Sequence, residues 1–170
     1  MLKNALIVLF VGLIAIQFFQ PEKNISDDKT YDISTKYAVP DDVNHLLKVA
    51  CNDCHTNNTE YPWYSKIQPV AWWLNNHVQD GKKHYNLSTF TKLPIAVQNH
   101  KFEETIEMLE EKEMPLESYT YLGLHKEANL TEAQRLTLIN WAKAQMDTLK
   151  ANYPADSLKM KPRPGGPPKS

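Results

Sequence analysis

Glycine and cysteine are scarce in this chain of 170 residues. It contains five glycines and two cysteines, with neither a G-x-G-x-x-G nor a G-x-x-x-x-G-K-[ST] pattern, which argues against the common nucleotide-binding folds. An excess of positive charge is missing too, because 19 Lys and Arg stand against 20 Asp and Glu. We therefore expect no nucleic acid partner. No segment alternates convincingly between apolar and polar residues, so the sequence predicts an all-α fold.

The first 20 residues are organised as a targeting or anchoring segment. Lys3 precedes an apolar run from Ala5 to Phe19 that only Gly12 and Gln17 interrupt, as in a charged n-region followed by a hydrophobic segment. No small-x-small cleavage pattern follows, so residues 1–20 are interpreted as an uncleaved, single-pass signal anchor; a cleaved signal peptide is the alternative. The run is shorter than the roughly 18 to 20 residues typical of a spanning helix, and tilt or bilayer thinning would have to compensate.

Composition divides the rest of the chain into three segments. Residues 21–42 are rich in acidic side chains and lack any helical or alternating period, which predicts a linker that acts as a tether. Residues 43–150 carry helical patterns and are the expected folded domain. Residues 151–170 end in a Pro-rich, Gly-containing stretch that cannot build a core, and we expect a disordered tail.

Two helices are predicted in the first half of the folded domain. A helix capped by Asp41 or Asp42 is expected to run directly into Cys51, with apolar residues at helical spacing. A second helix is expected to follow Pro69 and to stop at Gly81. Two adjacent tryptophans of this second helix are expected to be deeply buried: Trp72 and Trp73.

Two further helices are predicted in the second half. The third is expected to place Phe102, Thr105, Ile106 and Leu109 on one face and to be ended by Pro115. The fourth opens with a capping box that begins at Thr131. Its core-facing positions are expected to be Leu138, Trp141, Ala142, Gln145 and Leu149.

The segment Cys51-Asn52-Asp53-Cys54-His55 matches C-x-x-C-H. At this spacing two thiols can bond the two vinyl groups of one haem while the histidine binds its iron. A thioredoxin-like redox pair would need a βαβ setting, a zinc site would need more ligands at finger-like spacing, and a chance match is the third alternative. In a translocated chain we expect one covalently attached haem c, held by Cys51 and Cys54, with His55 as an iron ligand.

The order of these features resembles the class I cytochrome c fold: a helix ending in C-x-x-C-H, a Met-Pro pair, and a closing helix with an aromatic residue. That fold implies crossed first and last helices and a methionine at the sixth iron position. A closer resemblance is to the bacterial haem-binding-domain family of membrane-tethered single-haem proteins, over about residues 10–145. It is carried by Cys51–His55, Tyr61–Tyr64, Pro69–His77, Met114–Tyr119 and Leu130–Trp141. The resemblance implies haem attachment.

Met114 is the expected sixth ligand of the iron. It immediately precedes Pro115, and the chain between His55 and Met114 is long enough to reach the opposite face of a haem. Met108 falls near the apolar stripe of the third helix and is expected in the core. Three histidines are the alternative ligands: His77, His100 and His125.

These features predict an electron carrier on the periplasmic side of the bacterial inner membrane. Such a protein fixes the axial ligands, excludes water and presents a haem edge to redox partner proteins, while residues 1–20 contact the membrane. The alternative is a haem enzyme of the peroxidase type, or a redox or gas sensor, in which the sixth position opens. The Met114-Pro115 pair favours the carrier, for which no catalytic residue is expected.

Overall fold

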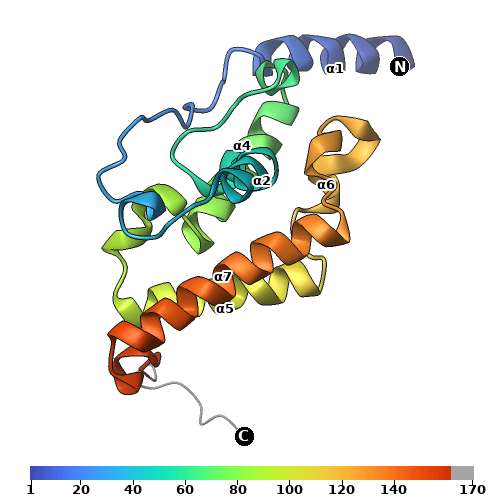
Figure 1. The fold of residues 1–170 in the computed structure, drawn as a ribbon. Coiled ribbons are helices and arrows are strands. Elements are labelled where there is room, and N and C mark those ends of the chain that lie inside the picture. The colour runs from blue at the N-terminus through green and yellow to red at the C-terminus, as the bar shows by residue number, and fades with distance from the viewer. Residues whose placement is uncertain (162–170) are drawn as a thin grey trace, which may run out of the picture.

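The computed structural model describes residues 1–161, which fold into helices joined by loops (Figure 1). The α-helices are α1 (Leu2–Ile16), α2 (Asp41–Ala50), α3 (Asn52–His55), α4 (Val70–His84), α5 (Ile95–Glu110), α6 (Glu117–Thr120) and α7 (Glu132–Asn152). Six 3-10 segments complete the described chain: η1 (Ile33–Thr35), η2 (Trp63–Lys66), η3 (Leu87–Lys92), η4 (Tyr121–Gly123), η5 (Lys126–Ala128) and η6 (Ala155–Leu158). Within residues 1–161 there is no strand, and the all-α prediction is confirmed for this part of the chain.

Local sequence signals explain α7. The Thr131 hydroxyl accepts a hydrogen bond from the Gln134 backbone, and the Gln134 side chain accepts one from the Thr131 backbone at 2.8 Å. This reciprocal pair satisfies two backbone donors at the helix start, as the capping box predicted. The core-facing positions of the prediction are all buried: Leu138, Trp141, Ala142, Gln145 and Leu149.

The main core lies between α5 and α7, which run side by side (Figure 1). Phe102 of α5 is fully buried at its centre. Its ring makes edge-on contacts with Tyr37, Phe90 and Trp141, at centroid distances of 5.0, 5.1 and 5.7 Å. Edge-to-face pairs of this kind stabilise beyond simple burial. α2 packs across α7 and adds its apolar face to the same core.

The segment 21–42 is part of the fold, so the predicted tether is wrong. Ile33 and Tyr37 keep only 4% and 3% of their surface exposed and belong to the main core. The Trp141 indole donates a hydrogen bond of 2.8 Å to the Ala38 carbonyl. Periodicity missed this because the segment contributes isolated apolar residues rather than one face of a helix. The folded domain therefore begins before residue 43.

The helix α4 also departs from prediction. It continues past Gly81 to His84, and the expected stop at Gly81 is wrong. Trp72 and Trp73 retain 39% and 45% exposure, so their deep burial is wrong as well. Adjacent residues on a helix point roughly 100° apart, and the narrow buried face of α4 is already filled. That face consists of Ala71, Leu74 and Val78.

The helix α5 confirms its predicted stripe but ends earlier than expected. Phe102 and Leu109 are buried, and Thr105 and Ile106 are half-buried. The helix stops at Glu110 rather than at Pro115. Lys112 adopts a positive φ of 62°, a left-handed conformation that ends a helix before the proline is reached.

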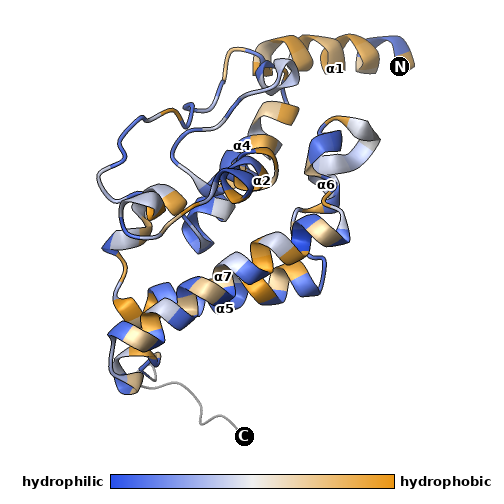
Figure 2. Cartoon of the chain, viewed as in Figure 1, coloured by the Kyte–Doolittle hydropathy of each residue, from blue (hydrophilic) through white to orange (hydrophobic). Residues whose placement is uncertain are grey.

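The two ends of the chain differ in how they relate to the core. Side chains from Leu2 to Ala15 are exposed on α1, which is mostly hydrophobic along its length (Figure 2). Among the helices of residues 1–161, none has both the length and the apolar character that crossing a membrane requires.

At the C-terminal end, η6 is ordered and Leu158 is buried, so the disordered tail predicted for 151–170 is wrong over 151–158. Its last part, 162–170, lies outside the described residues.

Replacing Phe102 with alanine should lower the free energy of unfolding by about 3–5 kcal/mol, because the substitution removes three aromatic contacts and leaves a cavity in the core. Urea denaturation of both proteins measures the difference. Leu136, which is 54% exposed on α7, is the matched control, and Leu136→Ala should change stability by no more than about 0.5 kcal/mol. Equal effects of the two substitutions would contradict the core assignment.

Candidate functional site

A cavity of about 620 Å³ lies among α3, α4, α5 and α7. Protein sites for small molecules and cofactors commonly measure roughly 300–1,000 Å³. The C-x-x-C-H residues line one part of the cavity, and Met114 and Met108 line another. Apolar side chains from three further parts of the core complete its wall: Leu47, Ala50, Leu109, Leu138 and Trp141. Four residues predicted from sequence are thus brought to one cavity: Cys51, Cys54, His55 and Met114.

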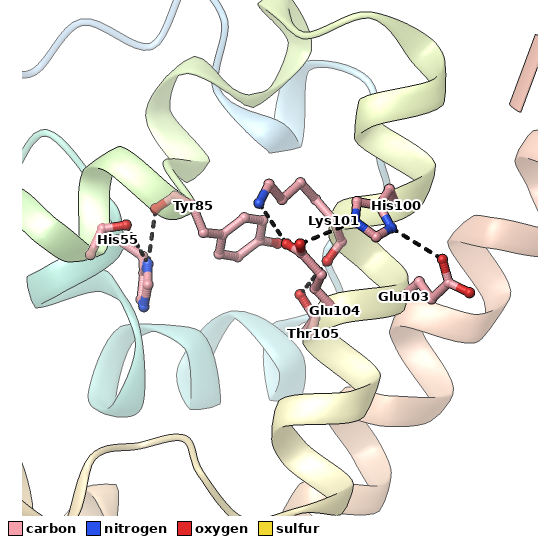
Figure 3. Close-up of polar contacts among 8 residues, drawn as sticks. His55, Tyr85, His100, Lys101, Glu103, Glu104 and Thr105 are labelled. Carbon is pink, nitrogen blue, oxygen red and sulfur yellow. Dashed lines mark hydrogen bonds and ion pairs between the residues drawn. The ribbon is translucent and has the colours of Figure 1, made fainter. Parts of the chain in front are cut away.

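His55 is oriented by two backbone carbonyls at the C-terminal end of α4. Its Nδ1 lies 3.1 Å from the Gly81 oxygen and 2.9 Å from the Tyr85 oxygen (Figure 3). Because both partners can only accept, Nδ1 carries the proton and Nε2 keeps its lone pair. Burial lowers the pKa of His55, against the opposing effect of these two hydrogen bonds. The ring is therefore neutral at neutral pH and has the tautomer of a metal ligand bound through Nε2.

Gly81 allows α4 to approach the motif this closely. A Cβ at this position would lie 2.5 Å from the Cys54 carbonyl oxygen and 3.0 Å from its Cβ. Only glycine fits there without a shift of the backbone. The contact keeps α4 against the short helix α3 and thereby places the Gly81 carbonyl within reach of His55.

Cys51 and Cys54 are half-buried, reduced thiols. Burial raises the pKa of Cys51 to about 12, with a smaller contribution from the neighbouring Cys54. Burial also raises the pKa of Cys54 to about 11, and the charge of Asp53 adds to the effect. Both side chains are consequently protonated at neutral pH, which makes them weak nucleophiles without outside activation.

Met114 lies on the segment that joins α5 to α6. Its backbone N–H donates to the Met108 carbonyl at 3.3 Å, and its own carbonyl accepts a hydrogen bond of 2.6 Å from Arg135 of α7. These contacts hold the Met114 segment between the end of α5 and the start of α7. Met108 is half-buried and also lines the cavity. The sequence predicts a position in the core for it, and it lies at the wall of the cavity instead.

The three alternative histidines have different surroundings. His77 lines the cavity, with its Nδ1 2.9 Å from the Trp73 carbonyl. His100 lies on the surface of α5, where its two ring nitrogens approach Glu103 and Glu104 at 3.2 and 3.1 Å (Figure 3). Of the three, His77 alone is among the residues found to line the cavity in the described chain.

His125 is engaged in a separate aromatic cluster. Its Nε2 lies 3.0 Å from the Tyr64 hydroxyl, and its ring stacks on Tyr119 at a centroid distance of 4.1 Å. The Tyr119 hydroxyl in turn donates a hydrogen bond of 2.7 Å to Asp53, inside the C-x-x-C-H segment. Tyr119 thus ties the chain that follows Met114 to the cysteine motif. Sequence reasoning missed this role because nothing local pairs Tyr119 with Asp53.

Tyr85 is a second cavity residue that sequence reasoning missed. Its ring extends from the end of α4 toward Lys101, Glu104 and Thr105 of α5 (Figure 3). The hydroxyl is buried beside the Thr105 side chain and forms no hydrogen bond of good geometry with residues 1–161, and burial raises its pKa well above the usual range. Tyr85 therefore presents a neutral hydroxyl at the cavity. A lone aromatic residue between two helices carries no sequence signal for this.

Comparison with known proteins gives one match. The family model described as the haem-binding domain matches residues 11–144, which is most of the chain. No curated protein and no solved structure matches the chain.

The raised pKa values predict slow alkylation of Cys51 and Cys54 in the haem-free chain. At pH 8 iodoacetamide should modify both thiols roughly tenfold or more slowly than a free cysteine, because only the thiolate reacts. The rate should keep rising with pH up to about pH 11. In concentrated urea, the same thiols should react at the ordinary rate. Fast modification of the folded chain at pH 8 would contradict the buried environment.

Gly81 and Gly12, which both lie in α-helices, provide a matched pair. Gly81→Ala should destabilise the protein by about 1–3 kcal/mol and disturb His55, because the new Cβ collides with the Cys54 backbone. Gly12→Ala meets nothing within 4 Å and should leave stability unchanged. Urea unfolding and the chemical shifts of the His55 ring report the two effects. An undisturbed His55 in Gly81→Ala would show that close approach of α4 does not orient this ring.

Proposed function

The chain belongs to the haem-binding-domain family, and from that premise we propose that it holds one haem c covalently on Cys51 and Cys54 and carries electrons. His55 and Met114 are the proposed axial ligands. The observation that carries this proposal is the presence of both thiols and of a neutral, oriented His55 on the wall of one cavity of cofactor size. A bound haem supplies one-electron transfer between ferric and ferrous iron.

The residues around the cavity suit such a group. Each thiol of the motif is reduced and can form one thioether bond, and His55 Nε2 is unprotonated and available as a ligand. Most of the exposed cavity wall is apolar, although Asp80, Lys101 and Glu104 also line it, and apolar surroundings favour a higher reduction potential. Tyr85 offers a buried, neutral hydroxyl at the cavity, and a haem carboxylate is a fitting acceptor for it.

Met114 supports the carrier over the enzyme or sensor. A thioether at the sixth position fills the coordination sphere and stabilises the ferrous state. Arg135 fixes the Met114 backbone at 2.6 Å, and the Tyr119–Asp53 hydrogen bond at 2.7 Å fixes the chain beyond it. A methionine ligand whose backbone is fixed before and after the side chain is suited to electron transfer, because the ligands of the iron should change little between its two oxidation states.

The helix α1 is the proposed membrane anchor, with the haem domain on the periplasmic side of the bacterial inner membrane. Its exposed side chains from Leu2 to Ala15 form a larger apolar surface than water-soluble proteins normally present. Lys3 lies in the first turn of α1 and precedes the apolar run that begins at Ala5, as expected for the cytoplasmic end. A periplasmic location also gives the thiols access to haem-attachment machinery, and redox proteins would be the partners.

Covalent attachment predicts that the haem stays with the chain after denaturation. Protein produced together with cytochrome c maturation machinery should retain its colour through acid-acetone extraction, because thioether bonds survive loss of the fold. The double variant Cys51→Ala/Cys54→Ala should lose all haem in the extraction or fail to acquire it. Asn52→Ala, between the two cysteines, should behave like the wild type. Complete extraction of haem from the wild type would refute covalent attachment.

Met114→Ala should remove the weak far-red sulfur-to-iron band of the ferric spectrum and lower the reduction potential, while Cys51 and Cys54 still hold the haem. Met108→Ala is the control, since Met108 also lines the cavity and its removal should preserve the band. Met114→His should stay low-spin without the band.

Two results would revise the ligand assignment. If Met114→Ala keeps the wild-type spectrum while His77→Ala changes it, Met114 is not the ligand. A wild-type ferric haem that is already high-spin would favour the enzyme or sensor, in which the sixth position is open.

A further inference from the structure

Exposed apolar side chains gather where η2 leads into α4. Trp63 is 75% exposed, the highest value among the tryptophans of the chain, and Trp73 is 45% exposed. We call this group the tryptophan surface; its members are Trp63, Ile67, Val70, Trp72 and Trp73, each at least 37% exposed. Five large apolar residues on one short stretch are more than the single exposed side chains of an ordinary surface.

The tryptophan surface is fixed next to the C-terminal end of α1. Gln17 and Gln68 form a reciprocal pair: the Gln17 oxygen accepts from the Gln68 backbone at 2.9 Å, and the Gln17 amide donates to the Gln68 carbonyl at 3.3 Å. The Phe19 carbonyl accepts two further hydrogen bonds, from the Gln68 side chain at 2.7 Å and from the Trp72 indole at 2.9 Å. α1 accordingly meets the domain at the start of α4 (Figure 1).

The stretch of chain that carries the tryptophan surface has few charged residues. Residues 61–79 contain no Asp or Glu, and Lys66 is their only Lys or Arg. The Lys66 side chain is exposed, and its backbone carbonyl accepts a hydrogen bond of 3.2 Å from Gln20. Glu22 and Lys23 line a small pocket together with Lys66, so the fit of this surface to lipid headgroups comes from its tryptophan and aliphatic side chains rather than from net positive charge.

We propose that the tryptophan surface lies in the headgroup layer of the membrane that α1 enters, and that it sets the orientation of the haem domain on that membrane. The proposal rests on the membrane anchor of the proposed function. Its occupant is a phospholipid bilayer rather than a second copy of the chain, because the surface continues directly into the exposed apolar side chains of α1.

The length of α1 supports this placement. Its 15 residues correspond to about 22 Å of helix, at ~1.5 Å per residue, against a hydrocarbon layer of about 30 Å. Residues that are bound directly to the end of so short a helix stay close to the membrane surface. No flexible linker separates α1 from the domain at this point, since Gln17 and Phe19 form hydrogen bonds directly with residues at the start of α4. Tryptophan prefers this depth because its ring is apolar and its N–H needs a polar partner.

The four tryptophans of the chain provide a test with an internal control. The full-length, haem-loaded protein is labelled with 5-fluorotryptophan and placed in nanodiscs of phosphatidylcholine and phosphatidylglycerol. The ¹⁹F signals are assigned from single Trp→Phe variants and recorded in the ferrous state. A minority of lipids carries gadolinium chelated at the headgroup, and lutetium replaces gadolinium in the reference sample.

Gadolinium should attenuate the signals of Trp63, Trp72 and Trp73 several-fold, while the signal of Trp141, which is 5% exposed in the core, stays close to its lutetium reference. Equal attenuation of all four signals, or none at the three surface positions, overturns the proposal. If the three tryptophans are shielded and analytical ultracentrifugation shows two copies of the chain in each nanodisc, the proposal is overturned in favour of contact between copies.

The anchor and the orientation fail in different ways. If the chain does not co-float with phospholipid vesicles, the anchor of the proposed function is wrong and the proposal falls with it. If it co-floats without attenuation at the three tryptophans, the anchor stands and the orientation is wrong. The variant Trp63→Gln/Trp73→Gln, which keeps the Trp72 hydrogen bond, should reduce the attenuation at Trp72 several-fold. Leu136→Gln on α7 is the matched control and should leave it unchanged.

Discussion

The arrangement of the site depends on the two hydrogen bonds that His55 Nδ1 makes to the carbonyls of Gly81 and Tyr85. A helix as short as α3 cannot fix the direction of a side chain by itself. The end of α4 does so, and it reaches His55 only because Gly81 lets two backbones approach without an intervening Cβ. One consequence is chemical: Nε2 retains its lone pair in a neutral ring. The other is structural, since α3 and α4 are joined at the cavity wall.

The opposite part of the cavity is built by longer-range packing. α5 and α7 share the aromatic core around Phe102, and this pair provides the surface against which Met114 is held. Tyr119 then returns to Asp53 inside the cysteine motif. The chain between Met114 and Tyr119 is thereby tied to α7 at one end and to the motif at the other. This arrangement suits the haem that we propose to lie between His55 and Met114.

Sequence reasoning succeeded where the signal is local. The capping box at Thr131 and the apolar spacing of α7 follow from residues three or four apart. The residues of the cysteine motif, which lie within five consecutive positions, line one cavity, while their bonds to haem stay a prediction. It failed where a partner far along the chain decides the outcome. From sequence alone Gly81 suggests a helix stop, and only its close contact with Cys54 explains why a glycine is needed there. Tyr37 likewise suggests part of a linker, and only its contact with Phe102 shows that it belongs to the core. Tyr85 shows no local pattern at all.

A crystal structure of the haem-loaded protein would show directly whether His55 binds the iron through Nε2. We expect the haem to fill the cavity between α3 and α5, with His55 Nε2 on the iron and Nδ1 still bound to the carbonyls of Gly81 and Tyr85. A haem bound elsewhere on the chain, or a His55 ring turned so that Nδ1 faces the iron, would contradict this expectation.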